Sequence, residues 1–175
     1  MAQNSSVGAQ NMNRIRILIT GGTFDKEYDE IGGKLFFKDS HVGEMLALGR
    51  CKLDLEIRTL MMIDSLDMTA ADRELIVNQC RNAAEHRIVI THGTDTMAET
   101  AVVLSAQVQE KTIVLTGAMV PYKFGSSDGL FNLGSALAFA QALPHGVYIA
   151  MNGRYHHAGR VVKDRTTGYF ERVGV

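Results

Sequence analysis

The chain has 175 residues, of which 46% are hydrophobic and 21% charged, and 18 basic against 19 acidic residues give a net charge of -1. A chain of this length can bury one sizeable core without disulfides or metal. The near-neutral charge excludes the basic footprint of a nucleic-acid-binding protein, and the apolar runs are too short to span a bilayer. We therefore expect a small-molecule partner, with no nucleic acid and no membrane.

The first residues are polar and lack the basic and apolar regions of a signal peptide, which predicts a flexible lead-in at 1–13 and a cytoplasmic protein. The two cysteines, Cys51 and Cys80, fit a reducing compartment and have no CxxC spacing. Cys80 shares a helical face with apolar neighbours, which predicts a small buried residue rather than a nucleophile or metal ligand.

Five apolar runs bounded by turn residues predict strands buried on both faces, at 15–20, 53–61, 87–91, 112–116 and 147–151. Helical patterns lie between or beside them, at 40–48, 70–85, 96–107 and 129–143; Thr69 and Asp72 form a capping-box pattern before the second. The alternation predicts an α/β fold, a single Rossmann-like domain with three layers, α/β/α, and a mostly parallel sheet. Asn152 and Gly153 then predict a hairpin that returns through 161–162.

Three loops that follow predicted strands are rich in glycine and polar residues: TGGT at 20–23, THGTDT at 91–96 and GAMVP at 117–121. Ligands of parallel sheets bind beyond the carboxyl ends of the strands, where these loops should lie. Glycine beside threonine lets the backbone approach a ligand and presents hydroxyl and amide groups, as an oxyanion site requires. For the first loop alone, a simple turn is an equal alternative. A dinucleotide-binding or Walker loop is excluded, because neither pattern occurs.

The second of these loops runs directly into a predicted helix, so Thr94, Asp95 and the helix amides can converge on one polar ligand. An ordinary helix N-cap is the alternative for Asp95. His92 has no second ligand at metal-binding spacing, and the adjacent strand residues His156 and His157 should point to opposite faces. The sequence therefore predicts no metal site.

Together, TGGTF at 20–24 and THGTDTMAET at 91–100 resemble the two signature segments of the bacterial-type asparaginase and glutaminase family, which hydrolyses side-chain carboxamides. Further matches are DSLDMT at 64–69, which is more similar to the cytoplasmic branch, SSDGLFNL at 126–133 and NGRYHHAGRVVK at 152–163. The resemblance implies that 14–175 is the family's amino-terminal catalytic domain with the smaller carboxy-terminal domain absent. It also implies a homodimer or homotetramer, since a neighbouring subunit completes the family's site.

Hydrolysis of an amide requires a nucleophile, a base, donors for the oxyanion and an acid for the leaving ammonia. The resemblance implies two catalytic threonines, Thr23 and Thr94, with Tyr28 activating or orienting the first and Lys163 paired with the second and with Asp95. A lysine acts as a base only if burial or a nearby cation brings its pKa below the ordinary value of about 10.4. Which threonine attacks is left open here, because both have a candidate base nearby.

The resemblance also implies a set of substrate-binding positions. Ser65 corresponds to a residue that binds the substrate α-carboxylate and Asp95 to one that binds its α-ammonium, while Leu66 stands where the family usually has a polar residue. The full set is Gly22, Asp64, Ser65, Gly93, Thr94, Asp95, Ala118 and Met119.

These features predict an amidohydrolase that converts L-asparagine to L-aspartate and ammonia through a threonine nucleophile, without a cofactor and with glutamine as a poorer substrate. The alternatives are a binding or regulatory module that does not turn over, and a hydrolase of another small amide. We expect the segment 24–39 to be an irregular, mobile lid that brings Tyr28 to Thr23. For Met119, Val120 and Phe131 the sequence favours core packing, and a subunit contact is the alternative.

Overall fold

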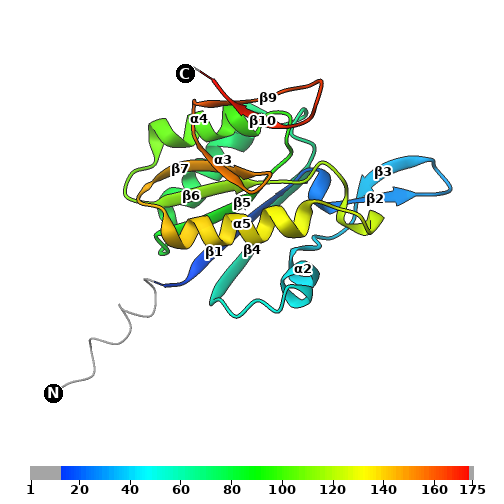
Figure 1. Ribbon diagram of the computed structural model, residues 1–175, viewed down its shortest axis with the longest axis horizontal. Helices are drawn as coiled ribbons and strands as arrows, with labels where there is room; N and C mark the ends of the chain where they lie inside the picture. Colours follow the sequence, from blue (N-terminus) through cyan, green and yellow to red (C-terminus); the bar gives the residue numbers. More distant parts are fainter. Residues whose placement is uncertain (1–12, 174–175) are drawn as a thin grey trace.

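A computed structural model describes residues 13–173, so the predicted lead-in lies, except for Asn13, outside the described residues. Its centre is a six-stranded sheet in the order β4-β1-β5-β6-β7-β8, parallel except for the last pair (Figure 1). The strands are β1 (Ile15–Gly21), β4 (Leu55–Ile63), β5 (Arg87–Thr91), β6 (Thr112–Thr116), β7 (Gly146–Met151) and β8 (Arg154–His157). Two separate antiparallel pairs are β2 (Lys26–Asp29) with β3 (Lys34–Phe37), and β9 (Val161–Lys163) with β10 (Phe170–Arg172).

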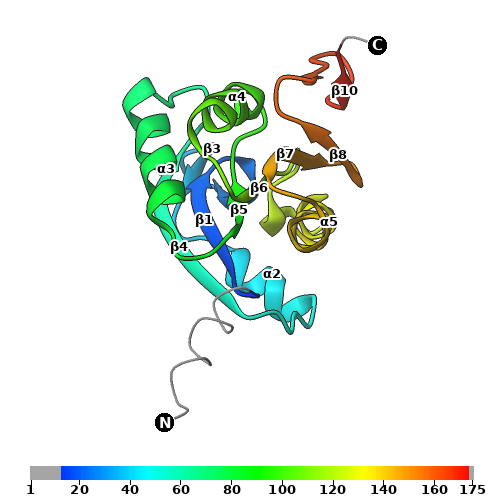
Figure 2. The same cartoon turned by 90° about the vertical axis from the view of Figure 1, so that its left-hand side faces the viewer.

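Helices cover both faces of the sheet (Figure 2). One face carries α3 (Ala70–Asn82) and α4 (Met97–Gln107), and the other carries α2 (Val42–Leu48) and α5 (Gly129–Ala142). Successive strand residues feed the two cores in turn, so Leu18 of β1 packs on the α3–α4 side and Ile17 and Ile19 on the other. The expected three-layer α/β/α architecture is confirmed.

The strand order places the predicted loops together. From β1 the chain crosses to β4 on one side, whereas β5, β6 and β7 follow on the other side, so the direction of winding reverses between β1 and β5. Doubly wound sheets bind ligands at such a reversal, beyond the carboxyl ends of the strands. The loops after β1 and β5 therefore occupy the position expected of a binding site.

Local sequence signals set the start of α3 and the end of α5. At the start of α3, the Thr69 and Asp72 side chains and backbone amides form the predicted capping box, with N–O distances of 2.8 and 3.3 Å. The helix ends at Asn82 rather than at 85, since Ala83 is extended. Likewise α5 ends at Ala142, because the residue that precedes Pro144 is pushed out of the helical region.

Two predictions about the strands are wrong. The strand β4 is not buried on both faces; it forms an edge of the sheet, and its residues 56–59 are exposed. The hairpin at Asn152 and Gly153 forms, with both residues at positive φ, but its return strand ends at His157. The chain turns again at Gly159, where φ is 74°, so 161–162 belongs to β9 in a separate sheet.

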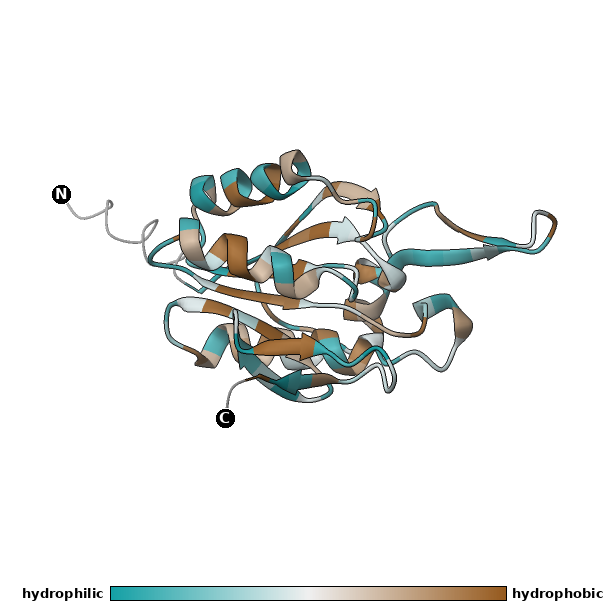
Figure 3. Cartoon of the chain, turned by 90° about the horizontal axis from the view of Figure 1, so that it is seen from above, coloured by the Kyte–Doolittle hydropathy of each residue, from teal (hydrophilic) through white to brown (hydrophobic). Residues whose placement is uncertain are grey.

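The prediction that the segment 24–39 is irregular is wrong. After a short 3-10 helix, Thr23–Asp25, the segment forms the hairpin of β2 and β3. Its turn closes because the Asp29 carboxylate accepts hydrogen bonds from the amides of Ile31 and Gly32, at 3.1 and 3.0 Å. The hairpin projects from the body of the molecule and carries mainly hydrophilic residues on β2 (Figure 3).

Other expectations about single residues are confirmed. Cys80 is fully buried, and burial raises the pKa of its thiol to about 12, which makes it unreactive. His156 is buried and His157 exposed, so the two point to opposite faces of β8. Across residues 13–173, no helix is long and apolar enough to cross a bilayer.

Candidate active site

Close approaches at two glycines bring the loops after β1, β4 and β5 together. A side-chain carbon at Gly22 would overlap the backbone of Gly93, and one at Gly93 would overlap Ser65. Gly22 also has φ of 81°, a conformation that L side chains rarely adopt. Because Thr23 and Thr94 each follow one of the two touching glycines, both threonines lie where these loops meet, and this meeting point is the candidate crevice.

A lysine from a distant part of the chain completes one side of this crevice. The ammonium of Lys163, the last residue of β9, donates hydrogen bonds to Thr94 Oγ1 at 2.8 Å and to Asp95 Oδ1 at 2.9 Å. Thr94 is buried and most of the Lys163 side chain is covered, while about a third of the Asp95 side chain remains exposed. The structure therefore joins a hydroxyl, an amine and a carboxylate, the groups that proton transfer to or from a threonine requires.

The loop after β6 closes the crevice on another side. Thr94 Oγ1 lies 3.6 Å from the sulfur of Met119, whose amide donates to the carboxylate of Asp128 at 3.0 Å. The buried Asn132 side chain then links Asp128, Gly117 O and the amide of Asn152, at distances between 2.9 and 3.1 Å. Sequence reasoning assigned no role to Asp128 or Asn132, although both lie in the segment SSDGLFNL.

The remaining wall contains the segment after β4. Ser65 is buried, and its hydroxyl has no hydrogen-bond partner among the described residues. Asp64 accepts hydrogen bonds from the Lys26 ammonium and from the Leu66 amide. Partial burial alone would raise the pKa of Asp64, but these bonds and the nearby charge of Lys163 hold that pKa below its ordinary value. Lys26 has no sequence pattern that marks it as part of a site.

The structure does not bring Tyr28 to Thr23. Thr23 is half-buried at the start of its 3-10 helix, whereas Tyr28 is 54% exposed on the projecting hairpin. Among the described residues, no hydrogen bond joins the two hydroxyls. The tyrosine instead lines a hollow of about 540 Å³ beside Lys123 and Phe124. Its proposed action on Thr23 stays a prediction.

Two further positions are placed clearly. Leu66 is apolar and 65% exposed, so its side chain supplies no polar group to the crevice. Ala118 is fully buried in the core beneath α5, which leaves only its backbone to face a substrate.

His92 has a structural environment rather than that of a metal ligand. Its Nδ1 lies 2.8 Å from the carbonyl of Gly93 and its Nε2 lies 2.9 Å from Thr100 Oγ1. Since a carbonyl only accepts, Nδ1 donates and Nε2 accepts from the hydroxyl. Burial lowers the pKa of His92 to about 4, so the ring is neutral. Within residues 13–173, no three histidine, cysteine or acidic side chains gather to hold a metal ion.

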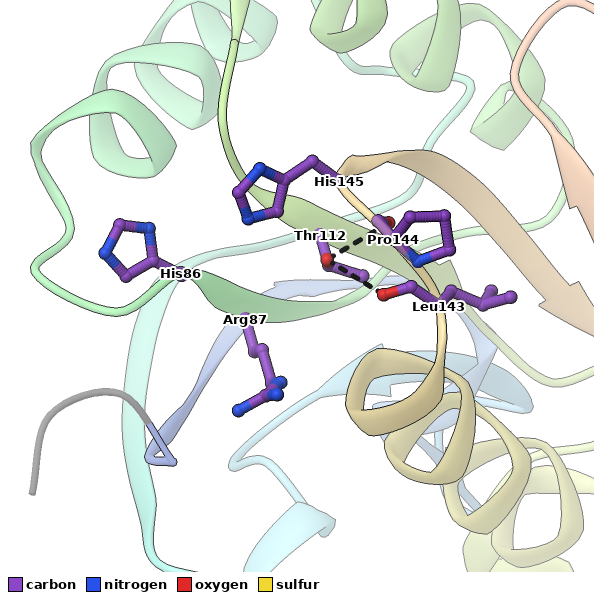
Figure 4. Close-up of a pocket in the computed structure, with 6 residues that line it drawn as sticks. All are labelled: His86, Arg87, Thr112, Leu143, Pro144 and His145. Carbon is purple, nitrogen blue, oxygen red and sulfur yellow. Dashed lines mark hydrogen bonds between the residues drawn. The ribbon is translucent and has the colours of Figure 1, made fainter. Parts of the chain in front are cut away.

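A second hollow, of about 500 Å³, lies at the opposite edge of the sheet, where β5 and β6 begin (Figure 4). The rings of His86 and His145 are nearly parallel there, with centroids 6.2 Å apart. Thr112, at its base, already donates to the carbonyls of Leu143 and Pro144 at 3.3 and 3.1 Å. This hollow is separate from the crevice at the strand ends, and the candidate active site is the crevice.

The amino-terminal domain of the asparaginase family matches residues 14–171, and the chain belongs to this family. It is 32% identical to an L-asparaginase from Thermococcus kodakarensis, over 89% of this chain and 49% of that protein. It is 34% identical to a probable periplasmic L-asparaginase from Haemophilus influenzae, over 93% and 50%.

The structure is similar to that of a probable cytoplasmic L-asparaginase from Campylobacter jejuni, with a TM-score of 0.76 and 32% identity. The likeness covers 86% of this chain and 49% of that one. The chain therefore spans about half the length of the relatives it matches.

Proposed function

We propose that this chain is an amidohydrolase that converts L-asparagine to L-aspartate and ammonia, with weak activity on glutamine and with a threonine as nucleophile. The observation that carries the proposal is the set formed by Lys163, Thr94 and Asp95 at the carboxyl end of β5. Membership of the asparaginase family supports the same reaction.

In this proposal a threonine Oγ adds to the carbonyl carbon of the side-chain amide and gives up its proton to a base. The carbon–nitrogen bond then breaks, and the nitrogen takes a proton and leaves as ammonia. Water hydrolyses the resulting ester and frees L-aspartate and the threonine. The Lys163 nitrogen lies 2.8 Å from Thr94 Oγ1, and the lysine exchanges a proton with that hydroxyl when its amine is neutral. Thr23 acts on the same substrate from the β1 side of the crevice.

The substrate's own charges fit the walls of the crevice. Asp95 keeps part of its carboxylate exposed while it holds Lys163, so it can also accept from the α-ammonium of an amino acid. Ser65 offers the hydroxyl for the α-carboxylate. Tyr28 reaches Thr23 when the hairpin of β2 and β3 closes over the substrate.

The test is ammonia release from a panel of free amides, beginning with L-asparagine and L-glutamine. Thr23→Ala and Thr94→Val should each lower turnover by two or more orders of magnitude, roughly the loss seen when a nucleophile or its proton relay is removed. Thr94→Ser keeps the hydroxyl and should retain measurable turnover. Binding of L-aspartate without ammonia release from any amide would instead establish the binding or regulatory module, and release from another amide would redefine the substrate.

We also propose that residues 14–175 act as one catalytic domain in a cytoplasmic homodimer or homotetramer. Two free cysteines and the likeness of DSLDMT to the cytoplasmic branch support that compartment. The sequence favours core packing for Met119, Val120 and Phe131, but the Met119 and Phe131 side chains are 40% and 63% exposed, while Val120 is half-buried. Exposed apolar groups beside the crevice favour a subunit contact there.

A further inference from the structure

One lysine of the β2–β3 hairpin extends its side chain back toward the crevice. Lys26 begins β2, and its ammonium contacts Asp64, the residue before Ser65. The same ammonium lies 5.8 Å from the centroid of the Phe37 ring, on the paired strand β3. Only 18% of the Lys26 side chain is exposed, although the hairpin that carries it projects into solvent.

The chemistry of this corner is incomplete without a ligand. A lysine ammonium has three protons, and the described residues take one of them, through Asp64. Next to Asp64, the Ser65 hydroxyl is buried and has no partner in the described part of the chain. A buried hydroxyl without a partner is costly, which favours an arriving acceptor. Leu66 turns outward and supplies no polar group.

We propose that Lys26 is the cationic binding residue for the substrate's α-carboxylate, which it holds beside Ser65 while Asp64 fixes the position of the ammonium. This assignment rests on the proposed amidohydrolase function and adds a specificity to it. The site takes amides that carry a carboxylate four atoms from the amide nitrogen in preference to amides without one. Lys26 thus replaces the polar side chain that is missing at Leu66, and it ties substrate binding to the hairpin.

Three substrates separate the contribution of each charged group. Succinamate is L-asparagine without its amino group, and β-alaninamide is L-asparagine without its carboxylate. Lys26→Met should raise KM for L-asparagine and succinamate about 10- to 100-fold, the effect of losing a charged hydrogen bond. The same variant should keep kcat/KM for β-alaninamide within about twofold of the wild-type value. Lys26→Arg should restore most of the affinity, and Lys34→Met, on the same hairpin, is the matched control.

The assignment is overturned if Lys26→Met leaves KM for L-asparagine unchanged. It is also overturned if the variant lowers kcat/KM for β-alaninamide as much as for L-asparagine, since an equal loss points to a disturbed hairpin. Thermal unfolding checks the variants, and Lys26→Gln serves if the methionine variant does not fold. Should the wild type release no ammonia, the proposed function fails, and calorimetric binding of L-aspartate decides the role of Lys26 alone. A Kd for L-aspartate that rises at least tenfold in Lys26→Met but not in Lys34→Met supports the role of Lys26 in binding the carboxylate. An unchanged Kd, or no binding to the wild type, overturns it.

Discussion

His92 shows how a single buried side chain supports the site without touching a substrate. Its two ring nitrogens hold Gly93 O and the Thr100 hydroxyl, so the imidazole fixes the loop that carries Thr94 to the first turns of α4. Both bonds require the neutral ring with its proton on Nδ1. Protonation at Nε2 would place a second donor against the Thr100 hydroxyl inside the core.

This environment makes stability depend on pH. Well above pH 6.5 His92 is neutral in both the folded and the unfolded chain. As the pH falls from 6.5 toward 4, the unfolded chain takes up a proton that the folded chain excludes. The contribution of His92 to the free energy of unfolding therefore decreases, by up to about 3 kcal/mol. Urea unfolding at a series of pH values measures this.

Two variants isolate the effect of the imidazole. His92→Gln removes the titrating group, so its free energy of unfolding should fall less steeply than that of the wild type between pH 6.5 and 4. Thr100→Val removes a hydrogen-bond partner but keeps the buried imidazole, and it should lose stability while retaining the steep dependence. Parallel curves for the wild type and His92→Gln would show that other groups govern acid unfolding.

At the scale of elements, α5 and the loop before it are held by one buried amide. Asn132 donates to Gly117 O and to Asp128, and it accepts from the Asn152 amide. Asn132→Leu would take this partner from the carbonyl of Gly117 and the amide of Asn152, and would remove one of the hydrogen bonds to Asp128, which should lower the free energy of unfolding by about 2–4 kcal/mol. Gln141→Leu, on the exposed side of the same helix, should change it by no more than about 0.5 kcal/mol. Chemical denaturation compares the two, and equal losses would contradict the role of Asn132.

The hairpin of β2 and β3 allows a direct observation of closure, because the chain has no tryptophan. Leu35 pairs with Tyr28 across the hairpin, and its side chain is exposed. We expect L35W, the sole tryptophan of that variant, to shift its emission to shorter wavelength when L-aspartate is added, as the hairpin moves against the body. A second variant, L35W with Thr94→Val, tests whether the shift follows binding rather than turnover. Emission that stays constant at saturating L-aspartate would rule out a closing lid.

How much of the fold and of the candidate site the sequence predicts depends on how far apart along the chain the interacting residues lie. Strands, capping boxes and glycine-threonine loops follow from local patterns, and they locate both threonines at the correct edge of the sheet. The bond from Lys163 to Thr94 joins residues 69 positions apart, so only the family resemblance indicated it. The pairing of Lys26 with Asp64 has neither a local period nor a family motif, so the sequence did not reveal it.

The exposure of β4 has the same kind of cause. Its apolar run predicts a strand buried on both faces, yet burial is decided by what the fold places alongside it. In this sheet β4 pairs with β1 alone and forms an edge. Local composition therefore predicted the strand correctly but not its position in the sheet.

For the whole molecule, the surface beside the crevice bears on assembly. Met119, Phe131, Val162 and Tyr169 all have exposed apolar side chains, and they come from the loop after β6, from α5, from β9 and from the loop before β10. The chain has a net charge of -1, so little charge repulsion opposes contact between copies. Covering these groups would also remove water from the partly exposed Asp95 and so strengthen its electrostatic contacts.

We therefore expect the active species to have about two or four times the 19.2 kDa mass of the chain, with closed symmetry. Light scattering at micromolar concentration, with ammonia release measured on the same fractions, tests this. Phe131→Ser should lower the mass and the activity together, because Phe131 lies at the start of α5 beside the turn between β7 and β8 and is the most exposed of the four apolar side chains. Leu48→Ser, an exposed leucine on α2, is the control and should change neither. A fully active species of about 19.2 kDa would show that one copy assembles the whole site, and the exposed apolar groups would then need a different partner.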